Sequence, residues 1–308
     1  MTVPARSSGF PDILSAEFAK IFDDRYKQLP DRVGEFYSIV GAEDTPRKDS
    51  YRTSEVGTFG DLSEFTGTVT YDDVSEGYDT TITPKEYSSG FQLERKLHDD
   101  GMYGVMNAKP KQLALAVQRT RQKHAAQPFN NAFSVDTTWR TGGDAVALCS
   151  DSHTTRSGAS TAAGFDNLIT AALSSVSVVA ARLQMRGFRG DRAERISVMP
   201  SHILVPPDLE DIAWEIVHSM GKLDTANNNA NFNKGRYQVK DWEYLSDTNN
   251  WFMYDAELLK DSFTWFERLA AEFAQVEDFD SITGKWRVYG RWGNGHGDWR
   301  SILGAQVS

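Results

Sequence analysis

The chain has one cysteine, Cys149, in 308 residues, which excludes a disulfide within the chain. Long apolar runs are also missing, because no stretch reaches the roughly 18 uninterrupted apolar residues of a membrane span. The N-terminal segment MTVPARSSGFPD lacks the apolar core of a secretory signal peptide. We therefore expect a protein that is made in the cytosol and stays soluble there. Its stability must come from packing and, if the fold is extended, from other subunits.

An excess of positive charge is absent as well. The 33 Lys and Arg residues are outnumbered by 43 Asp and Glu residues, and the formal net charge is −10. This balance argues against a protein that grips nucleic acid by neutralising its phosphates, although an acidic wall that only encloses nucleic acid is compatible with it. The apolar content of 40% and the charged content of 25% are typical of a soluble globular protein with one large or two modest domains.

Residues that could form a metal site or a nucleophile are few. Cys149 and His153 have the spacing of half a zinc site, but the sequence offers no second cysteine or close histidine pair to complete about four ligands. As a nucleophile, Cys149 would need a base within hydrogen-bond reach, and His153 and His124 are the candidates. We favour a buried or incidental thiol.

Glycine-rich and acidic runs do not complete a motif either. The stretch GRWGNGHG at 290–297 lacks the lysine of a phosphate-binding loop. The acidic run at 72–79 fails the calcium-loop pattern, because Val74 occupies a position that needs an oxygen ligand. We predict no catalytic residue, no metal and no cofactor, and therefore a protein that is not an enzyme.

Apolar periodicity of 3.6 residues predicts several helices. The first covers Ser15–Tyr26. The second is a basic helix that begins at Asn107, with Pro110 in its first turn, and ends or bends at Pro128. The third follows a long apolar stripe from Phe165 to Leu183 and ends at Gly187, and the fourth lies in the segment 206–220.

Alternation with a period of two predicts a β-hairpin between Glu64 and Lys96. Threonines alternate with aromatic and apolar residues in both arms, 65–71 and 78–83. An isolated hairpin is marginal in water, and this one has few large apolar side chains, so it needs a further surface to pack against. Further strands are predicted at 196–199, 203–205, 237–244 and 251–254, and aromatic C-terminal strands at 263–266 and 286–292.

The sequence itself resembles a known family. The strings GTFGDLSEFTGTVTYDDV, GYDTTITPKEYSSGFQLERKL, QMRGFRGDRAERISVMPSHILVPPDL and DWRSILGAQVS look like the major head subunit, or major capsid protein, of Mu-like tailed bacteriophages and prophages. The likeness extends in the same order from about Phe22 to Ser308. None of these strings encodes chemistry, so the resemblance points to a structural role.

The resemblance implies the α+β fold of the Hong Kong 97 (HK97) capsid protein. The implied segments are an N-terminal arm at 1–50, an extended β-hairpin loop at 51–100, a peripheral domain with a long spine helix at 101–187, an axial domain at 188–262, and C-terminal strands at 263–308 that return to the peripheral domain. The asparagine-rich tract at 224–235 would lie near the capsomer axis.

The implied function is that of a major capsid protein of a tailed double-stranded DNA phage. Such a chain assembles with itself, through pentamers and hexamers, into the icosahedral head of the virion, and it does so in the cytoplasm of the host bacterium without binding DNA sequence-specifically or touching a membrane. About 50 residues precede the hairpin, so we expect a separate scaffolding protein. A portal and decoration proteins are further candidate partners. Lys85 and Lys96 have no identifiable acceptor asparagine, so we expect no isopeptide crosslink.

Charge adds one hypothesis about contacts between subunits. The predicted hairpin tip carries four acids, which are Asp72, Asp73, Glu76 and Asp79. The predicted long helix carries five bases, which are Lys109, Lys111, Arg119, Arg121 and Lys123. We predict that the tip settles against a basic surface of a neighbouring subunit, either this helix or an arm. In the alternative interpretation, the helix bases face packaged DNA.

Two other classes of protein remain open at this point. The chain could form the shell of an encapsulin-like compartment that houses cargo enzymes, or it could be a soluble enzyme that uses Cys149. A shell would show itself as closed particles, whereas a cysteine enzyme would lose activity on thiol labelling.

Overall fold

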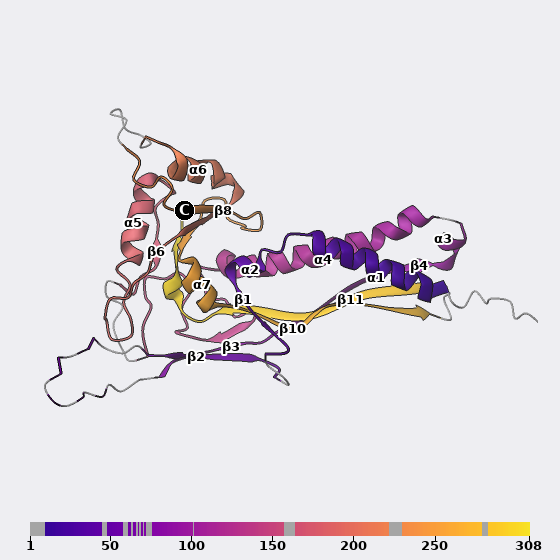
Figure 1. The fold of residues 1–308 in the computed structure, drawn as a ribbon, viewed down its shortest axis with the longest axis horizontal. Helices are drawn as coiled ribbons and strands as arrows, with labels where there is room; N and C mark the ends of the chain where they lie inside the picture. The colour runs from indigo at the N-terminus through magenta and orange to yellow at the C-terminus, as the bar shows by residue number, and fades with distance from the viewer. Residues whose placement is uncertain are drawn as a thin grey trace, which may run out of the picture.

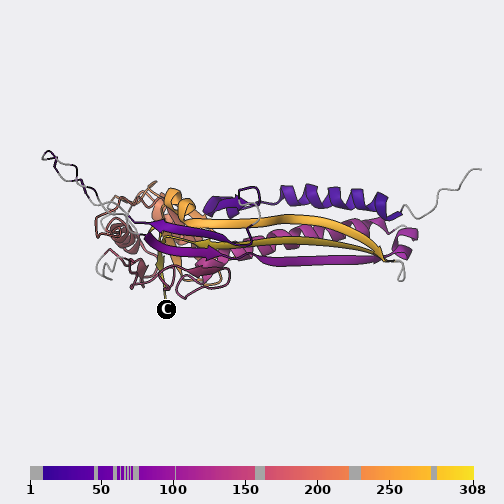
Figure 2. The same ribbon diagram turned by 90° about the horizontal axis from the view of Figure 1, so that it is seen from below.

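The structure, a computed structural model, describes residues 10–44, 48–57, 61, 62, 64, 65, 67, 69, 71, 76–100, 102–156, 164–221, 230–278 and 283–308. The strands among these described residues form three sheets. Figure 1 shows a compact lobe at one end, from which a long arm extends, and Figure 2 shows that the arm is thin in the perpendicular direction. We call these two parts the lobe and the long arm.

The long arm consists of a four-stranded sheet with helices along it. The sheet has the order β1 (Ser38–Gly41), β10 (Phe263–Asp278), β11 (Thr283–His296) and β4 (Lys85–Glu94). Helix α4 (Tyr103–Asn130) runs the length of the arm, with α3 (Arg95–Asp99) leading into it, and α1 (Phe10–Gln28) lies beside α4. At 1.5 Å per residue, α4 is about 42 Å long.

Helix α1 confirms the helix predicted over Ser15–Tyr26, and it docks onto its own chain. Phe18 and Phe22, one turn apart, are both fully buried. Phe18 packs in a cluster with Trp286 of β11, and Phe22 packs in another with Leu113 of α4. The N-terminal helix therefore covers apolar side chains at the contact between α4 and the sheet of the long arm.

The lobe is built on a five-stranded sheet that is covered on both faces. Its order is β6 (Leu168–Ile169), β12 (Ile302–Ala305), β9 (Trp251–Tyr254), β7 (His202–Val205) and β8 (Gln238–Asp241). Side chains alternate between the two faces with the period of two that a strand imposes. Trp251 and Met253 of β9 face one core, whereas Phe252 and Tyr254 face the other.

Helices from different parts of the chain fill these two cores. On one side lie α5 (Ser175–Met185) and α6 (Glu210–His218), which follows the short helix η2 (Pro207–Leu209). On the other side lie the last turns of α4, α2 (Val33–Phe36) and α7 (Ala256–Ser262). Because α4 ends in this second core, the long arm and the lobe are joined by packing as well as by the chain.

The third sheet shows that the hairpin prediction was wrong in its first arm. Strand β3 (Glu76–Ile82) matches the predicted second arm, but its partners are β2 (Tyr51–Val56) and β5 (Arg140–Gly142) of the same chain. The described residues Phe65, Val69 and Tyr71 lie outside any strand and are exposed. An alternating sequence pattern is not enough to form a strand where its apolar side chains stay exposed, as these three do. Ile82, in contrast, packs against Trp139 and Phe266.

Two helix predictions need correction. Helix α4 begins at Tyr103 rather than at Asn107, and it continues past Pro128 to Asn130. Pro128 removes one helical N–H, and the carbonyl of His124 that it leaves unpaired accepts a hydrogen bond from Asn294 Nδ2 at 2.7 Å instead. The stripe from Phe165 is helical only from Ser175, where Ser174 and Ser177 form a capping box. Gly187, just beyond α5, confirms the predicted stop.

Predicted strands differ in how well they match. Those at 203–205, 251–254 and 263–266 are present, and β8 covers the central part of 237–244, whereas 196–199 is not a strand. Strand pairing places 85–94 in the sheet of the long arm and 302–305 in the sheet of the lobe. The predicted division of the chain into five consecutive segments stays a prediction. The strand pairings favour grouping residues by the sheet to which they belong rather than by consecutive stretches of sequence.

Candidate assembly surfaces

The predicted acidic tip lies only partly within the described residues. Asp72 and Asp73 fall outside them, whereas Glu76 and Asp79 belong to β3. The carboxylate of Glu76 is exposed, and it lies 3.8 Å from Arg156 of the same chain. Asp79 accepts hydrogen bonds from the Ser54 hydroxyl and the Arg52 guanidinium, which lower its pKa. Asp79 is therefore already engaged within its own subunit.

The five bases predicted on the long helix separate into two groups. Four of them are exposed on α4, namely Lys109, Lys111, Arg119 and Lys123. Arg121 is only 3% exposed, so its charge is not available to another subunit. The sequence held a signal for this, because Arg121 lies four residues after Val117 and four before Ala125, which are both buried.

Arg121 is the centre of a buried polar cluster instead. Its Nη1 donates to Glu267 Oε1 at 2.6 Å, and its Nη2 donates to Glu267 Oε2 at 3.3 Å and to Asp31 Oδ2 at 3.4 Å. The guanidinium also lies 5.2 Å from the ring centroid of Trp265 and 5.7 Å from that of Trp292. These contacts tie α4 to β10, β11 and the segment that precedes α2.

Cys149 has the environment of a structural thiol. It is buried, and burial raises its pKa, so that the reactive thiolate is not formed near neutral pH. A side chain at Gly304 of β12 would overlap the Cys149 sulfur, because the segment that carries Cys149 packs closely against β12. His124 accepts the indole N–H of Trp292, and burial lowers its pKa to about 4.

His153, the other candidate base, belongs to a hub around Asn167. His153 Nδ1 lies 2.5 Å from Asp144 Oδ2, and its Nε2 lies 3.0 Å from Asn167 Oδ1. Asn167 Nδ2 donates to the carbonyls of Leu148 at 2.9 Å and Ile302 at 3.0 Å. Sequence reasoning missed Asn167, because a lone asparagine carries no motif. The hub fixes the segment that carries Cys149 to β12.

A carboxyl with a raised pKa marks the place where the third sheet meets the lobe. Glu55 of β2, Asp298 and Arg300 line a cavity of about 370 Å³. Arg300 Nη1 donates to Asp298 at 3.0 Å, and its Nη2 donates to Asp191 at 3.2 Å. Burial, together with the charge of Asp298, raises the pKa of Glu55 to about 7.

The pKa of Glu55 leads to an expected pH dependence. Because the folded-state pKa lies above the usual 4.5, protonation favours the folded state. The resulting stability, at most about 3 kcal/mol, is full below pH 4.5 and is lost as the pH rises through 7. Glu55→Gln should therefore flatten the pH profile of the thermal unfolding midpoint in this window. The matched variant of an exposed acid, Glu76→Gln, should leave the profile unchanged; equal profiles for all three proteins would contradict the expectation.

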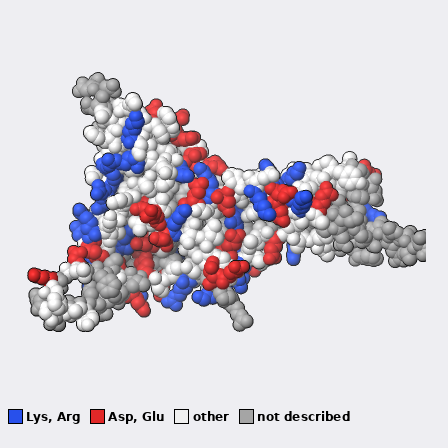
Figure 3. Space-filling model, in the orientation of Figure 1, with Lys and Arg blue, Asp and Glu red and all other residues white. Residues whose placement is uncertain are grey.

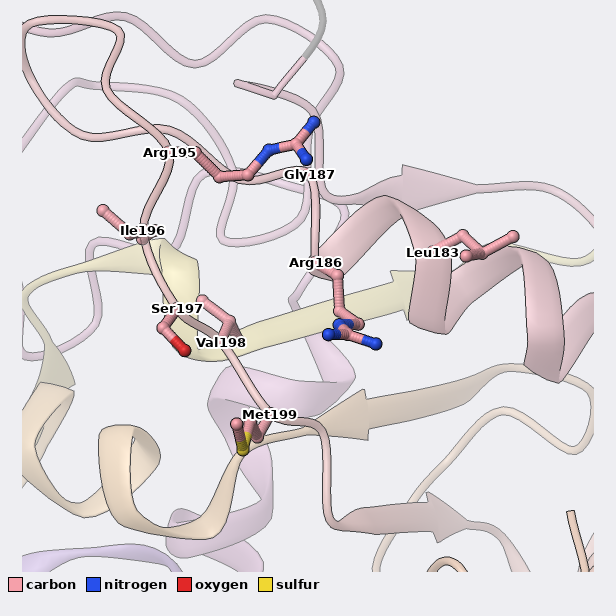
Figure 4. A pocket seen from close by; sticks show the side chains of 8 residues that line it. All are labelled: Leu183, Arg186, Gly187, Arg195, Ile196, Ser197, Val198 and Met199. Atoms are coloured by element: carbon pink, nitrogen blue, oxygen red, sulfur yellow. The ribbon is translucent and has the colours of Figure 1, made fainter.

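The edges of the lobe carry charged and exposed apolar side chains. In Figure 3, Lys and Arg side chains gather over α5 and the loop after it, whereas Asp and Glu side chains gather over α6. Beside the end of α5 lies an open groove of about 590 Å³, lined by Leu183, Arg186, Arg195 and Met199 among others (Figure 4).

Within the described ranges, no group of three or more His, Cys, Asp and Glu residues could hold a metal ion. No helix in that part of the chain combines the length and the apolarity needed to cross a bilayer. The features that stand out are therefore surfaces rather than a pocket with reactive groups.

Comparison with known proteins decides the family. A family model described as "Phage capsid protein" matches residues 77–305. The chain belongs to the phage capsid protein family. The prediction of a major capsid protein is thereby confirmed, and the family favours a phage capsid over the encapsulin-like alternative. No curated protein sequence matches the chain.

Solved capsid structures share the fold. The mature capsid of bacteriophage PhiM1 is 8% identical with a TM-score of 0.55, covering 91% of this chain and 88% of that one. The procapsid of bacteriophage JBD30 is 14% identical with a TM-score of 0.53, covering 100% and 77%. A virus-like particle from Pyrococcus furiosus is 9% identical with a TM-score of 0.53, covering 95% and 99%. These likenesses confirm the α+β, HK97-like capsid fold.

Proposed function

We propose that this capsid protein forms pentamers and hexamers that close into the icosahedral head of a tailed, Mu-like phage or prophage around double-stranded DNA. The observation that carries the proposal is the match to the phage capsid family over residues 77–305 together with the HK97-like fold. The role is mechanical rather than catalytic, which agrees with the buried, protonated Cys149.

The proposal includes partners and a place of assembly. A separate scaffolding protein directs closure, a portal occupies one vertex, and decoration proteins are candidate binders of the outer surface. The shell assembles in the cytoplasm of the host bacterium, and the subunit ends in the virion. The net charge of −10 supports a wall that encloses DNA without gripping it.

Electron microscopy of particles tests this function. The chain is expressed alone and together with the genes that neighbour it, and the lysates are fractionated by sedimentation and imaged in negative stain. We expect closed shells, tubes or capsomer rings that contain this chain. A monodisperse monomer under both conditions would contradict the proposal.

We further propose that the acidic tip contacts the exposed bases of α4 in a neighbouring subunit. The structure narrows the bases to Lys109, Lys111, Arg119 and Lys123, because Arg121 is buried. Each exposed ion pair contributes at most about 1 kcal/mol, but the contact repeats in every subunit. Reversing Asp72, Asp73 and Glu76 to lysine should therefore lower the particle yield. An unchanged yield would contradict the contact. If the bases of α4 face DNA instead, their removal should leave empty-shell assembly intact.

A further inference from the structure

The lobe presents two flanks of opposite charge. We define the basic flank as the outer side of α5 with the segment 195–199, and the acidic flank as the outer side of α6. Figure 1 places α5 and α6 at different edges of the lobe, and Figure 3 shows the separation of the charges along those edges. Each flank also carries exposed apolar side chains, which is the composition of an interface rather than of a solvated surface.

The basic flank is an apolar helix face beside a groove. Helix α5 already buries Val178, Ala181 and Met185 in the core of the lobe. On its other side, Val176 is 69% exposed and Leu183 is 61% exposed. Helices that are apolar all round are normally covered on both sides. The nearby groove adds Met199, which is 68% exposed, and the exposed guanidinium groups of Arg186 and Arg195.

The acidic flank presents one aromatic anchor between two acids. Trp214 of α6 is 58% exposed, and its ring stacks on His218 one turn later, with centroids 4.7 Å apart. This stack holds the indole in place before any partner binds. Asp211, three residues before Trp214, is exposed on the same side of the helix, and Glu215, the next residue after Trp214, is exposed beside this side. Tryptophan, together with tyrosine and arginine, is enriched among the residues that contribute most to binding at protein interfaces.

The two flanks converge at one end of the lobe. Asn233 Nδ2 donates to the carbonyl of Ser175, at the start of α5. Asn231 Nδ2 donates to the carbonyl of Ile216, near the end of α6. The segment 231–233 thus links the start of α5 to the end of α6, so the two flanks belong to one connected unit of the lobe.

We propose that the acidic flank of one copy of this chain docks on the basic flank of the next copy. Trp214 then packs near Leu183 and Met199, and the acids beside it face Arg186 and Arg195. A contact between two different surfaces of identical chains is head-to-tail, and it closes into a ring when the rotation between copies allows. This inference rests on the proposed function, and it names the surfaces that build the pentamers and hexamers.

A charge swap tests the docking in the full chain. The basic-flank variant carries Arg186→Glu and Arg195→Glu, and the acidic-flank variant carries Asp211→Arg and Glu215→Arg. Either variant alone should weaken each contact by about tenfold and reduce the particle yield. The chain with all four substitutions should regain assembly, because every contact again joins opposite charges. Circular dichroism and the unfolding midpoint show which variants are folded.

A crosslinking ladder gives a second readout that does not depend on yield. Cys149 is buried, so cysteines introduced at the surface are the thiols that react. The chain with Leu183→Cys and Ile212→Cys, one on each flank, should give a ladder that ends at five or six subunits with a short bismaleimide. The control with Val176→Cys and Leu183→Cys, both on the basic flank, should give no ladder.

The outcomes separate this inference from the proposed function. If folded flank variants assemble as well as the wild type, or if the cross-flank cysteines give dimers only, the docking is overturned while the capsid function stands. If the wild-type chain forms no particles under any condition, the proposed function itself fails. Loss of assembly in each single-flank variant, with recovery in the fourfold variant, supports the docking.

Discussion

Replacement of Arg121 by methionine should lower the free energy of unfolding by about 3–5 kcal/mol, because it leaves the carboxylate of Glu267 buried without its partner. Arg121 is 3% exposed and makes two hydrogen bonds to Glu267, with Trp265 and Trp292 beneath it. The side chain of Glu267 is itself largely buried. A loss of this size should lower the unfolding midpoint by about 10 °C, measured by calorimetry.

Two further variants define the cause of the Arg121 effect. Arg119→Met removes an exposed base of the same helix, and it should change the unfolding free energy by less than about 0.5 kcal/mol. The double variant with Arg121→Met and Glu267→Met should recover part of the loss, because it removes the orphaned charge as well. If the two single arginine variants were equally stable, the buried ion pair would have no structural role.

Replacement of Asn167 by aspartate should cost about 2–4 kcal/mol, although the two side chains have nearly the same shape. Asn167 is fully buried, and its amide nitrogen donates to the carbonyls of Leu148 and Ile302. A carboxylate has no N–H to donate, so its charge would face these carbonyl oxygens. The expected result is a lower midpoint in chemical denaturation, with a smaller loss at acid pH because a protonated carboxyl regains one donor.

The matched control for this change is Asn249→Asp. Asn249 is exposed in the loop before β9, so its replacement should leave the denaturation midpoint within experimental scatter of the wild type. Equal midpoints for the Asn167 and Asn249 variants would show that the hub around Asn167 does not hold the segment of Cys149 to β12.

The sequence predicted those elements in which local pattern and tertiary burial agree. The run Trp251–Tyr254 is a central strand because both faces of its sheet are covered, so all four residues are buried. The helix around Phe18 and Phe22 was predictable because its apolar face is the face that packs. The described part of the first predicted hairpin arm is not a strand for the opposite reason, since Phe65 and Tyr71 follow the alternation but stay 70% and 91% exposed.

Long-range pairing could not be predicted from local pattern. Strands β10 (Phe263–Asp278) and β11 (Thr283–His296) pair over their whole lengths, but the part of β10 after Phe266 alternates weakly and contains register shifts near Leu269. The burial of Arg121 was missed because the bases of α4 were grouped by charge alone. The position of Arg121 on the same side of the helix as Val117 and Ala125 would have indicated it. Asn167 was missed because its role depends on three segments that meet only in the folded chain.

For the candidate surfaces, too, some features could be predicted from the sequence and others depend on the folded chain. Membership of the phage capsid family and the fold class could be predicted because strings spread along the chain resemble a known family; the family match confirms the first and the solved capsid structures confirm the second. The residues of the proposed docking surfaces could not be predicted, because an exposed tryptophan such as Trp214 and a buried one such as Trp251 look alike in a sequence. Only the packing of α6 shows which side of the helix is left uncovered.

The central claim is that the uncovered surfaces of this chain are covered by other copies of itself. The most direct measurement is a single-particle reconstruction of the particles formed when the chain is expressed with its neighbouring genes. The account predicts closed shells of fivefold and sixfold rings of this chain, with α6 of each subunit against α5 of the next. Particles whose walls consist of a different protein, or in which both flanks face solvent, would contradict it.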